Sequence, residues 1–175
     1  MPELPEVETT RRALAPVLEG ALLSRIEVRR DRMLRRQHRP ADFVDRLRGR
    51  TVDALRRHGK FLLADVAGDV VWVTHLGMSG RMSIAAPGDP EVPHTNVIVA
   101  TGTGAEVRFI DPRTFGFVAA LTPGEYAASS LARLGPDAFT ALPRSQALAR
   151  RLTGRTAPIK ALLLDQHVLA GLGNI

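Results

Sequence analysis

Residues 61–76 read FLLADVAGDVVWVTHL, which is two short apolar runs separated by Ala67-Gly68-Asp69. Short runs that are rich in valine and bounded by glycine and aspartate are typical of β-strands joined by a turn. The stretch therefore predicts two neighbouring strands of one sheet.

Further short apolar or alternating runs occur along the chain, at residues 22–28, 96–100, 107–110 and 115–121. Short strands at this spacing, separated by clusters of Gly, Pro and Asp, predict a β-sandwich or a flattened barrel. Residues 41–47 predict a short helix between the strands.

The sequence before the strands predicts a helix. Pro5 suits its first turn, because the missing N–H would be unpaired there in any case. Apolar residues then recur at helical spacing, at Val7, Leu14 and Val17, and Pro16 marks the expected end.

After residue 123 the pattern changes from strands to helices, which are expected at 126–134, 143–152 and 159–170. The predicted fold class is therefore α+β. It consists of an N-terminal helix, a two-layer antiparallel β-sandwich over residues 1–134, and a helical unit over residues 135–175.

The last part of the sequence contains residues that typically begin and end a helix. Thr156 is placed to cap the last helix, Pro158 fits its first turn and Gly171 is placed to end it. The turn that follows puts Asn174 at the cap of a further helix.

The chain is basic, with 24 Lys and Arg against 18 Asp and Glu and a net charge of +6. The excess lies in residues 11–60, which carry 15 basic and 6 acidic side chains, whereas residues 61–175 are balanced. Such a segment favours a polyanionic partner, since neutralising phosphates releases counterions. A solvated arginine-rich face explains the charge alone equally well.

Only two of the basic residues, Lys60 and Lys160, are lysines. Lysine and arginine are not interchangeable where a compact charge must enter a narrow site or lose a proton. Both lysines are therefore candidates for chemistry or for close phosphate contact.

The composition excludes several classes of protein. The chain has no cysteine, which rules out disulfides and cysteine-ligated metal within it. No secretory leader and no apolar run of membrane-spanning length is apparent, so a soluble intracellular protein is expected. A length of 175 residues allows one domain, or one domain and a fragment.

The first residues, MPELPEVE, carry the strongest chemical signal. If Met1 is removed, Pro2 becomes a secondary amine with the carboxylate of Glu3 beside it. A terminal amine titrates at about 7.7–8.0, so a useful fraction is unprotonated near neutral pH. It can then attack an electrophilic carbon and form an iminium. A Pro-Glu start is equally a good beginning for a helix, and these residues alone leave both interpretations open.

Five separated motifs occur in order: PELPEVET at 2–9, RRHGKFLL at 56–63, HLGMSG at 75–80, DPRTFG at 111–116 and IKALLLDQHVLAGLGNI at 159–175. Together they resemble the N-terminal part of the formamidopyrimidine-DNA glycosylase family of bifunctional base-excision repair enzymes. The sister family, endonuclease VIII, shares the Pro-Glu start, but two of the motifs resemble the oxidised-purine branch more closely.

The resemblance implies an activity and its catalytic residues. Oxidised purines, 8-oxoguanine and formamidopyrimidines, would be removed from double-stranded DNA through a Schiff base, and β,δ-elimination would then cut the strand, also at abasic sites. Pro2 would be the nucleophile, Glu3 the acid that helps to open the sugar ring, and Lys60 a contact to the lesion nucleotide and its backbone.

The resemblance also implies DNA contacts. His94, Arg113, Lys160 and Asn174 would contact DNA, the last two within a helix-two-turn-helix element of which residues 135–175 are the first part. Met78, Arg113 and Phe115 would fill the void that an extruded base leaves. Glycines on both sides of Met78 favour a loop tip over core packing.

The remaining expectations concern one departure from the family's sequence, the cofactor, the oligomeric state and the cellular location. Thr114 stands where many family members have a second arginine. The family's zinc finger has no counterpart here, so no cofactor is expected in these residues. The resemblance implies a monomer in the bacterial cytoplasm, associated with the nucleoid and not with a membrane. Two alternatives remain: a damaged-DNA-binding fragment without catalysis, and a small-molecule enzyme with a proline base such as a tautomerase.

Overall fold

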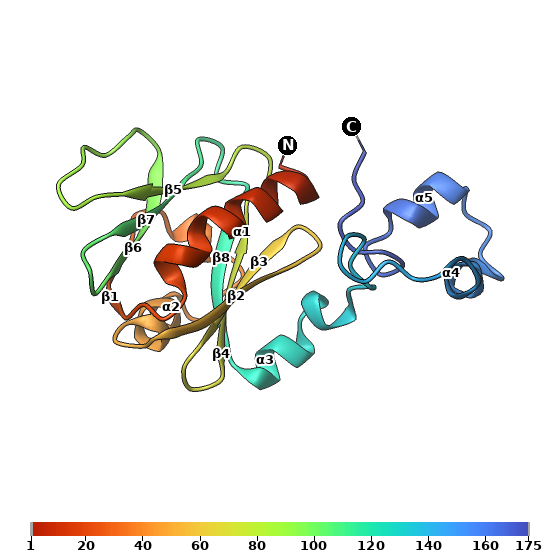
Figure 1. Cartoon of the computed structure of the whole chain (residues 1–175), viewed down its shortest axis with the longest axis horizontal. Coiled ribbons are helices and arrows are strands. Elements are labelled where there is room, and N and C mark those ends of the chain that lie inside the picture. The colour runs from red at the N-terminus through yellow and green to blue at the C-terminus, as the bar shows by residue number, and fades with distance from the viewer. Residues whose placement is uncertain (1, 175) are drawn as a thin grey trace.

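The computed structural model describes residues 2–174 and is built on two antiparallel sheets (Figure 1). The first sheet has the order β1-β6-β7-β5, formed by Leu23–Val28, Thr95–Thr101, Glu106–Ile110 and Arg81–Ala85. The second has the order β2-β3-β4-β8, formed by Val52–His58, Phe61–Val66, Val70–His75 and Phe117–Leu121.

Helices flank and follow the sandwich. The α-helices are α1 (Leu4–Leu18), α2 (Pro40–Leu47), α3 (Pro123–Ala128), α4 (Ser145–Leu152) and α5 (Ile159–Leu164), and the 3₁₀ turns are η1 (Asp31–Leu34) and η2 (Ser130–Arg133). α1 lies against the sandwich, whereas α4 and α5 stand to one side of it, beyond α3 (Figure 1). No helix among residues 2–174 is long and apolar enough to cross a membrane.

The predicted hairpin at residues 61–76 is confirmed. β3 and β4 pair in antiparallel register from Phe61 opposite His75 to Val66 opposite Val70. Sequence analysis missed β2 and β5, which lie at sheet edges and carry more polar residues than the central strands. An edge strand buries less of itself, so its apolar signal is weaker.

Several predicted helix ends were wrong. α1 passes through Pro16 and ends at Leu18. Pro16 cannot donate to the Arg12 carbonyl, but the pattern resumes after it, and the Glu19 N–H donates to the Ala15 carbonyl at 2.9 Å. The stretch 126–134 is two short turns, α3 and η2, broken at Ser129, whose side chain accepts the Leu131 N–H.

The last helix is shorter than predicted. α5 covers Ile159–Leu164 with Pro158 as its N-cap residue, so Thr156 is not the cap. The Asp165 carboxylate accepts the N–H of His167 at 2.9 Å, a local turn that competes with helix continuation. Residues 165–170 therefore form turns.

The main core lies between the two sheets and includes the inner faces of α1 and α2. Phe43 of α2 packs edge-on against Trp72 of β4, with ring centroids 6.4 Å apart. The largest fully buried side chains include Phe43, Phe109, Leu14, Leu18, Leu23, Met33, Leu47, Leu63 and Ile98. Burial of this apolar set is the chief stabilising term of the sandwich.

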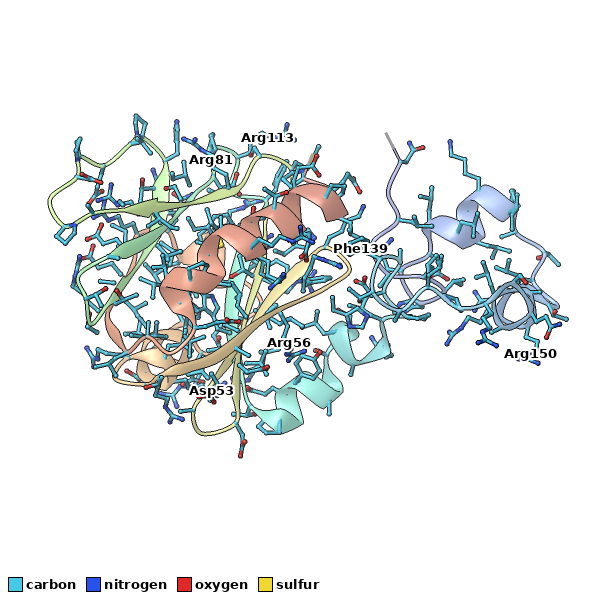
Figure 2. The ribbon with its side chains drawn as sticks, viewed as in Figure 1. Asp53, Arg56, Arg81, Arg113, Phe139 and Arg150 are labelled. Carbon is cyan, nitrogen blue, oxygen red and sulfur yellow. The ribbon has the colours of Figure 1, made fainter. Side chains whose placement is uncertain are left out.

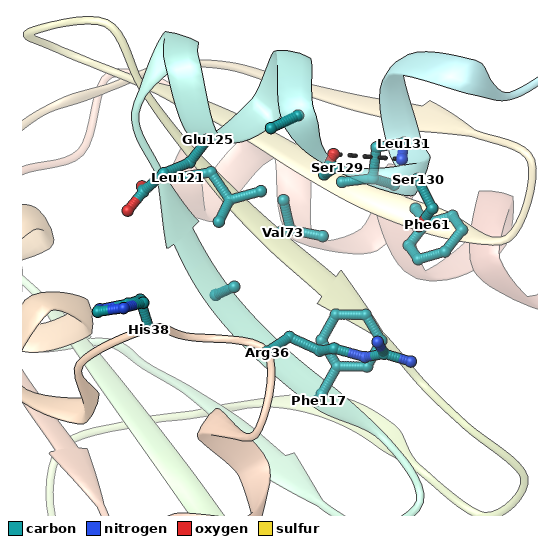
Figure 3. Close-up of a pocket in the computed structure, with 12 residues that line it drawn as sticks. Arg36, His38, Phe61, Val73, Phe117, Leu121, Glu125, Ser129, Ser130 and Leu131 are labelled. Atoms are coloured by element: carbon teal, nitrogen blue, oxygen red, sulfur yellow. Dashed lines mark hydrogen bonds between the residues drawn. The ribbon is translucent and has the colours of Figure 1, made fainter.

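A second cluster covers the outer face of the β2-β3-β4-β8 sheet. Leu131 of η2 packs there on Leu63, Val73 and Ala119. A groove of about 400 Å³ remains beside it, with Arg36 next to Phe117 at one end (Figure 3). The last described residues contact the sandwich at a different place, the β2–β3 turn.

Candidate active site

The start of α1 places Pro2 just ahead of a helix, as predicted. Glu3 is the N-cap residue, and its N–H donates to the Glu6 carboxylate at 2.9 Å. Pro5 occupies the first turn, where a missing N–H costs nothing. Val7 is buried against the sandwich and fixes the direction of the helix. The N-terminal residues are therefore held by α1.

Glu3 and Lys60 form an ion pair at this end of α1. Their side chains are only 13% and 16% exposed, and Lys60 lies at the two-residue β2–β3 turn, after Gly59. Both Glu3 carboxylate oxygens are buried, and Oε2 faces the Lys60 ammonium. Burying a carboxylate is costly unless it is paired, and the Lys60 ammonium supplies the partner here.

The C-terminal turn closes over this pair. A Cβ atom at Gly173 would lie 1.7 Å from Oε2 of Glu3 and 2.5 Å from Nζ of Lys60. A Cβ atom at Gly171, whose φ is +104°, would lie 2.4 Å from Cδ1 of Leu4. Only glycine permits such a close approach, so both glycines are part of the site's construction.

Arg57 joins three segments behind the pair. Its side chain is 1% exposed and bonds Glu8 of α1 at 3.0 Å and both oxygens of Asp137 at 2.5 and 2.9 Å. Asp137 also accepts the N–H groups of Gly59 and Thr140. One buried guanidinium thus connects α1, the β2–β3 hairpin and the beginning of the helical segment.

The charges at this junction stabilise one another. The hydrogen bond from Arg11 is the largest influence on Glu8 and, with bonds from Arg12 and Arg57, lowers its pKa to about 2. Burial acts to raise the pKa of Asp137, but the bonds from Arg57 and from backbone N–H groups hold it well below its usual range. Both carboxylates are therefore ionised near neutral pH.

Two loops meet at the rim of the sandwich. The buried Asp111 carboxylate accepts the Ser79 hydroxyl at 2.6 Å and the N–H groups of Gly116 and Arg113 at 2.8 and 3.2 Å. A Cβ atom at Gly77 would lie 2.4 Å from the Gly116 nitrogen, so the loops pack backbone to backbone. Asp111 therefore joins the two loops into one packed unit.

The predicted void-filling side chains gather on these loops. Met78 and Phe115 are 44% and 41% exposed, so they do not pack in the core. Arg113 donates to the Met78 sulfur at 3.0 Å and lies 4.9 Å above the Phe115 ring. Figure 2 shows Arg113 at the edge of the sandwich. Their role at a base step stays a prediction.

Two residues near the loops have left-handed backbone conformations. Thr114 has φ +53° and His94 has φ +67°. His94 is exposed, and its carbonyl accepts the Asp111 N–H at 3.0 Å, which places it beside the Arg113 loop. For a β-branched residue such as Thr114 this conformation costs on the order of 1–3 kcal/mol and needs support from its surroundings.

His75 links Lys60 to the loops. Its ring stacks on Phe117 at 5.6 Å and lies 4.8 Å from Phe61, and its Nδ1 accepts the Gly77 N–H at 3.1 Å. Burial first, then the nearby cation of Lys60 and those of two arginines, lowers the pKa of His75 to about 4. The ring is therefore neutral near pH 7.

Lys160 and Asn174 line one hollow with Leu163, Leu172 and other residues of the C-terminal segment. Both side chains are exposed. The structure therefore brings together the two residues that sequence analysis predicted as phosphate contacts, although the helix between them is shorter than expected. Their binding of phosphate stays a prediction.

Comparison with known proteins identifies the family. Residues 1–118 match the model of the formamidopyrimidine-DNA glycosylase N-terminal domain. The chain belongs to the formamidopyrimidine-DNA glycosylase family. It is 45% identical over 182 residues to the formamidopyrimidine-DNA glycosylase of Rhodospirillum rubrum and 44% identical over 188 residues to that of Bradyrhizobium sp.. These alignments cover 100% of the chain but 63% and 64% of the relatives.

Solved glycosylase structures show the same fold. The Lactococcus lactis Fpg in complex with DNA containing an abasic site matches 99% of the chain and 64% of its own length, with a TM-score of 0.86 and 28% identity. The same enzyme with DNA containing N7-benzyl-Fapy-dG has a TM-score of 0.87 and 29% identity over the same shares. The chain thus spans less than two thirds of these proteins.

Sequence analysis missed several residues that build the candidate site. Arg57 and Asp137 were not singled out, and Gly173 was seen only as part of a turn. Arg57 lies within the basic run of residues 56–60 and gave no distinct signal, because β2 itself was not recognised. Residues 2–174 contain no group of three His, Cys, Asp or Glu side chains placed to hold a metal. With no cysteine either, they do not fit the family's zinc finger.

Proposed function

We propose that the chain is the catalytic N-terminal portion of a DNA glycosylase and AP lyase that removes oxidised purines from double-stranded DNA. The observation that carries the proposal is the buried Glu3–Lys60 pair beside Pro2 at the start of α1. Family membership supports it, because the relatives are named as formamidopyrimidine-DNA glycosylases.

The chemistry follows from these groups. Once Met1 has been removed, the lone pair of the Pro2 nitrogen attacks C1′ of the damaged nucleotide, and the bond to the base breaks with the electron pair leaving on the base. Glu3 takes up the proton that the Pro2 nitrogen releases and passes it to the ring oxygen of the sugar, which opens the ring and leaves an iminium between Pro2 and C1′, while the departing base takes a proton from water.

Strand cleavage requires no further nucleophile. The iminium acidifies the hydrogen at C2′, whose loss expels the 3′ phosphate, and a second elimination expels the 5′ phosphate. Water then hydrolyses the iminium and restores the amine. Lys60 supplies a compact cation for the backbone of the lesion nucleotide.

In this proposal, the two loops that carry Met78, Arg113 and Phe115 extrude the damaged base. Phe115 and Met78 wedge into the space that the extruded base leaves, and Arg113 bonds the widowed partner base. Exposure of the two apolar side chains, joined through Arg113, supports the assignment. His94, Lys160 and Asn174 would contact the DNA backbone. A DNA repair protein of this kind would act at the bacterial nucleoid.

Borohydride trapping tests the proposal. The protein is incubated with a duplex carrying 8-oxoguanine opposite cytosine and, separately, with an abasic-site duplex, and intact mass establishes whether Met1 is removed. We expect a covalent adduct that a Pro2→Gly variant loses. With Met1 removed, an adduct on neither duplex would replace the proposal by a non-catalytic DNA-binding function.

A further inference from the structure

Arg35, just after η1, makes unusual contacts with the loop that carries Arg113 and Phe115. Its guanidinium donates to three consecutive carbonyls, those of Gly116 at 2.5 Å, Phe115 at 2.5 Å and Thr114 at 3.4 Å. It also lies 5.4 Å from the Phe117 ring centroid. A planar fork with five N–H donors suits several acceptors in a row, which an ammonium cannot span.

The loop is held from two sides by different parts of the chain. Asp111, within the loop, accepts the N–H groups of Arg113 and Gly116. Arg35, about 80 residues earlier in the sequence, donates hydrogen bonds to the loop's carbonyls on the other side. A turn whose donors and acceptors are both engaged has few alternative conformations.

The backbone between these contacts is strained. Thr114, at φ +53°, lies in the left-handed region that β-branched residues rarely adopt. Such a conformation persists only where surrounding contacts impose it. The carbonyls of Thr114 and of the next two residues are those that Arg35 engages, so Arg35 supplies that constraint from outside the loop.

We propose that Arg35 is a positioning residue that presets the Arg113 and Phe115 side chains for insertion at the damaged base pair. Arg35 acts through the loop backbone, not by contact with the reacting atoms. The inference rests on the proposed function, because it assigns Arg35 to the base-extrusion step. Excision of a base that must be extruded depends on this step, whereas reaction at a site that has already lost its base does not.

The first test examines the free protein. Amide hydrogen exchange is measured by NMR for Arg35→Met and for the matched control Arg36→Met, whose arginine also lies over Phe117 but donates to no carbonyl among the described residues. We expect faster exchange at Arg113 and Gly116 in Arg35→Met alone. Unchanged exchange in Arg35→Met would overturn the proposal, whether or not the protein is an enzyme.

The second test separates extrusion from chemistry. Single-turnover excision is measured on the 8-oxoguanine duplex and borohydride trapping on the abasic duplex, in Arg35→Met, Phe115→Ala and the double variant. We expect Arg35→Met to slow excision on the order of ten- to a hundredfold, with trapping unchanged. In the Phe115→Ala background the same substitution should have a smaller effect, because only the positioning of Arg113 then remains to be lost.

Other outcomes are decisive against the proposal. An equal loss on both duplexes, or a full additional loss in the double variant, would mean that Arg35 does not act through Phe115. Weaker binding to undamaged duplex with a reduced salt dependence would make Arg35 a phosphate contact instead. If the unchanged protein forms no adduct on the abasic duplex, the proposed function fails, and the exchange experiment still decides whether Arg35 holds the loop.

Discussion

The sandwich and the helical segment after residue 135 are stabilised in different ways. The sandwich encloses a large apolar core, whereas the helical segment leaves Phe139, Leu142 and Ile159 about 60% exposed, at 59%, 63% and 60%. The segment is joined to the sandwich through the buried Arg57–Asp137 pair and the glycine turn over Glu3. Buried polar contacts therefore take part in holding the segment beside the proposed catalytic pair, in addition to the buried Val168, Leu169 and Ala170.

The largest effect is expected when the junction is broken. Arg57→Met leaves the buried Asp137 carboxylate without its partner, which typically costs about 3–5 kcal/mol. Urea unfolding should show the loss, and limited proteolysis should locate it after residue 135. Arg56→Met is the control, since its half-exposed pair with Asp65 should contribute less than about 1 kcal/mol. Both arginines lie on β2, and Figure 2 labels Arg56. Equal effects of the two substitutions would contradict a special role for the junction.

The second prediction concerns how the stability of the sandwich depends on pH, in contrast to that of the helical segment. The pKa of His75 is lowered from 6.5 to about 4, so below pH 6.5 the unfolded chain takes up a proton before the folded one. The stability that neutral His75 contributes is present above pH 6.5 and is lost as the pH falls to 4, up to about 3 kcal/mol. Melting temperatures measured across this range should show a slope that His75→Gln removes.

The buried contacts of Arg57 with Glu8 and Asp137 should lose stability only at lower pH. Glu8, with its pKa lowered to about 2, contributes stability that is present above its usual pKa of 4.5 and lost toward pH 2. Proteolysis at pH 5 should therefore find the helical segment still attached while the sandwich is already weakened. Release of the segment at pH 5 before the sandwich loosens would contradict this order.

A smaller effect is expected at the glycine turn. Gly173→Ala places a Cβ atom within 1.7 Å of Glu3, and such overpacking typically costs about 1–3 kcal/mol. We expect the turn to shift away from Glu3 and the yield of borohydride trapping to fall. Gly124→Ala is a suitable control, because nothing lies within 4 Å of its Cβ position. Normal trapping by Gly173→Ala would show that the turn is not part of the site.

The smallest change in stability is expected at exposed apolar side chains of the helical segment. Leu142→Ser combined with Ile159→Ser should alter the free energy of unfolding by less than about 0.5 kcal/mol each, because both side chains are already exposed. Self-association, measured by sedimentation velocity, should decrease. Leu22→Ser, at a 46% exposed position of the sandwich, provides the comparison. A marked loss of stability would show that these side chains are packed in solution.

The sequence anticipated the parts of the fold that depend on neighbouring residues. The hairpin at 61–76 follows from apolar runs around a turn, and the start of α1 follows from Pro5 and the spacing of Val7 and Leu14. It misjudged helix ends at Pro16 and Leu164, where single hydrogen bonds decide whether a turn continues. Edge strands were missed because their additional polar side chains obscure the alternation of apolar and polar residues that indicates a strand.

The sequence by itself determined the family, through ordered motifs, and the candidate residues Pro2, Glu3 and Lys60 within them. Only the tertiary structure showed that Glu3 and Lys60 form a buried pair, and that Arg57 and Asp137, 80 residues apart, connect the two regions behind it. Arg35 likewise meets its loop from about 80 residues away. Local propensity depends on neighbours in sequence, whereas ion pairs and backbone contacts over such separations exist only once the chain has packed.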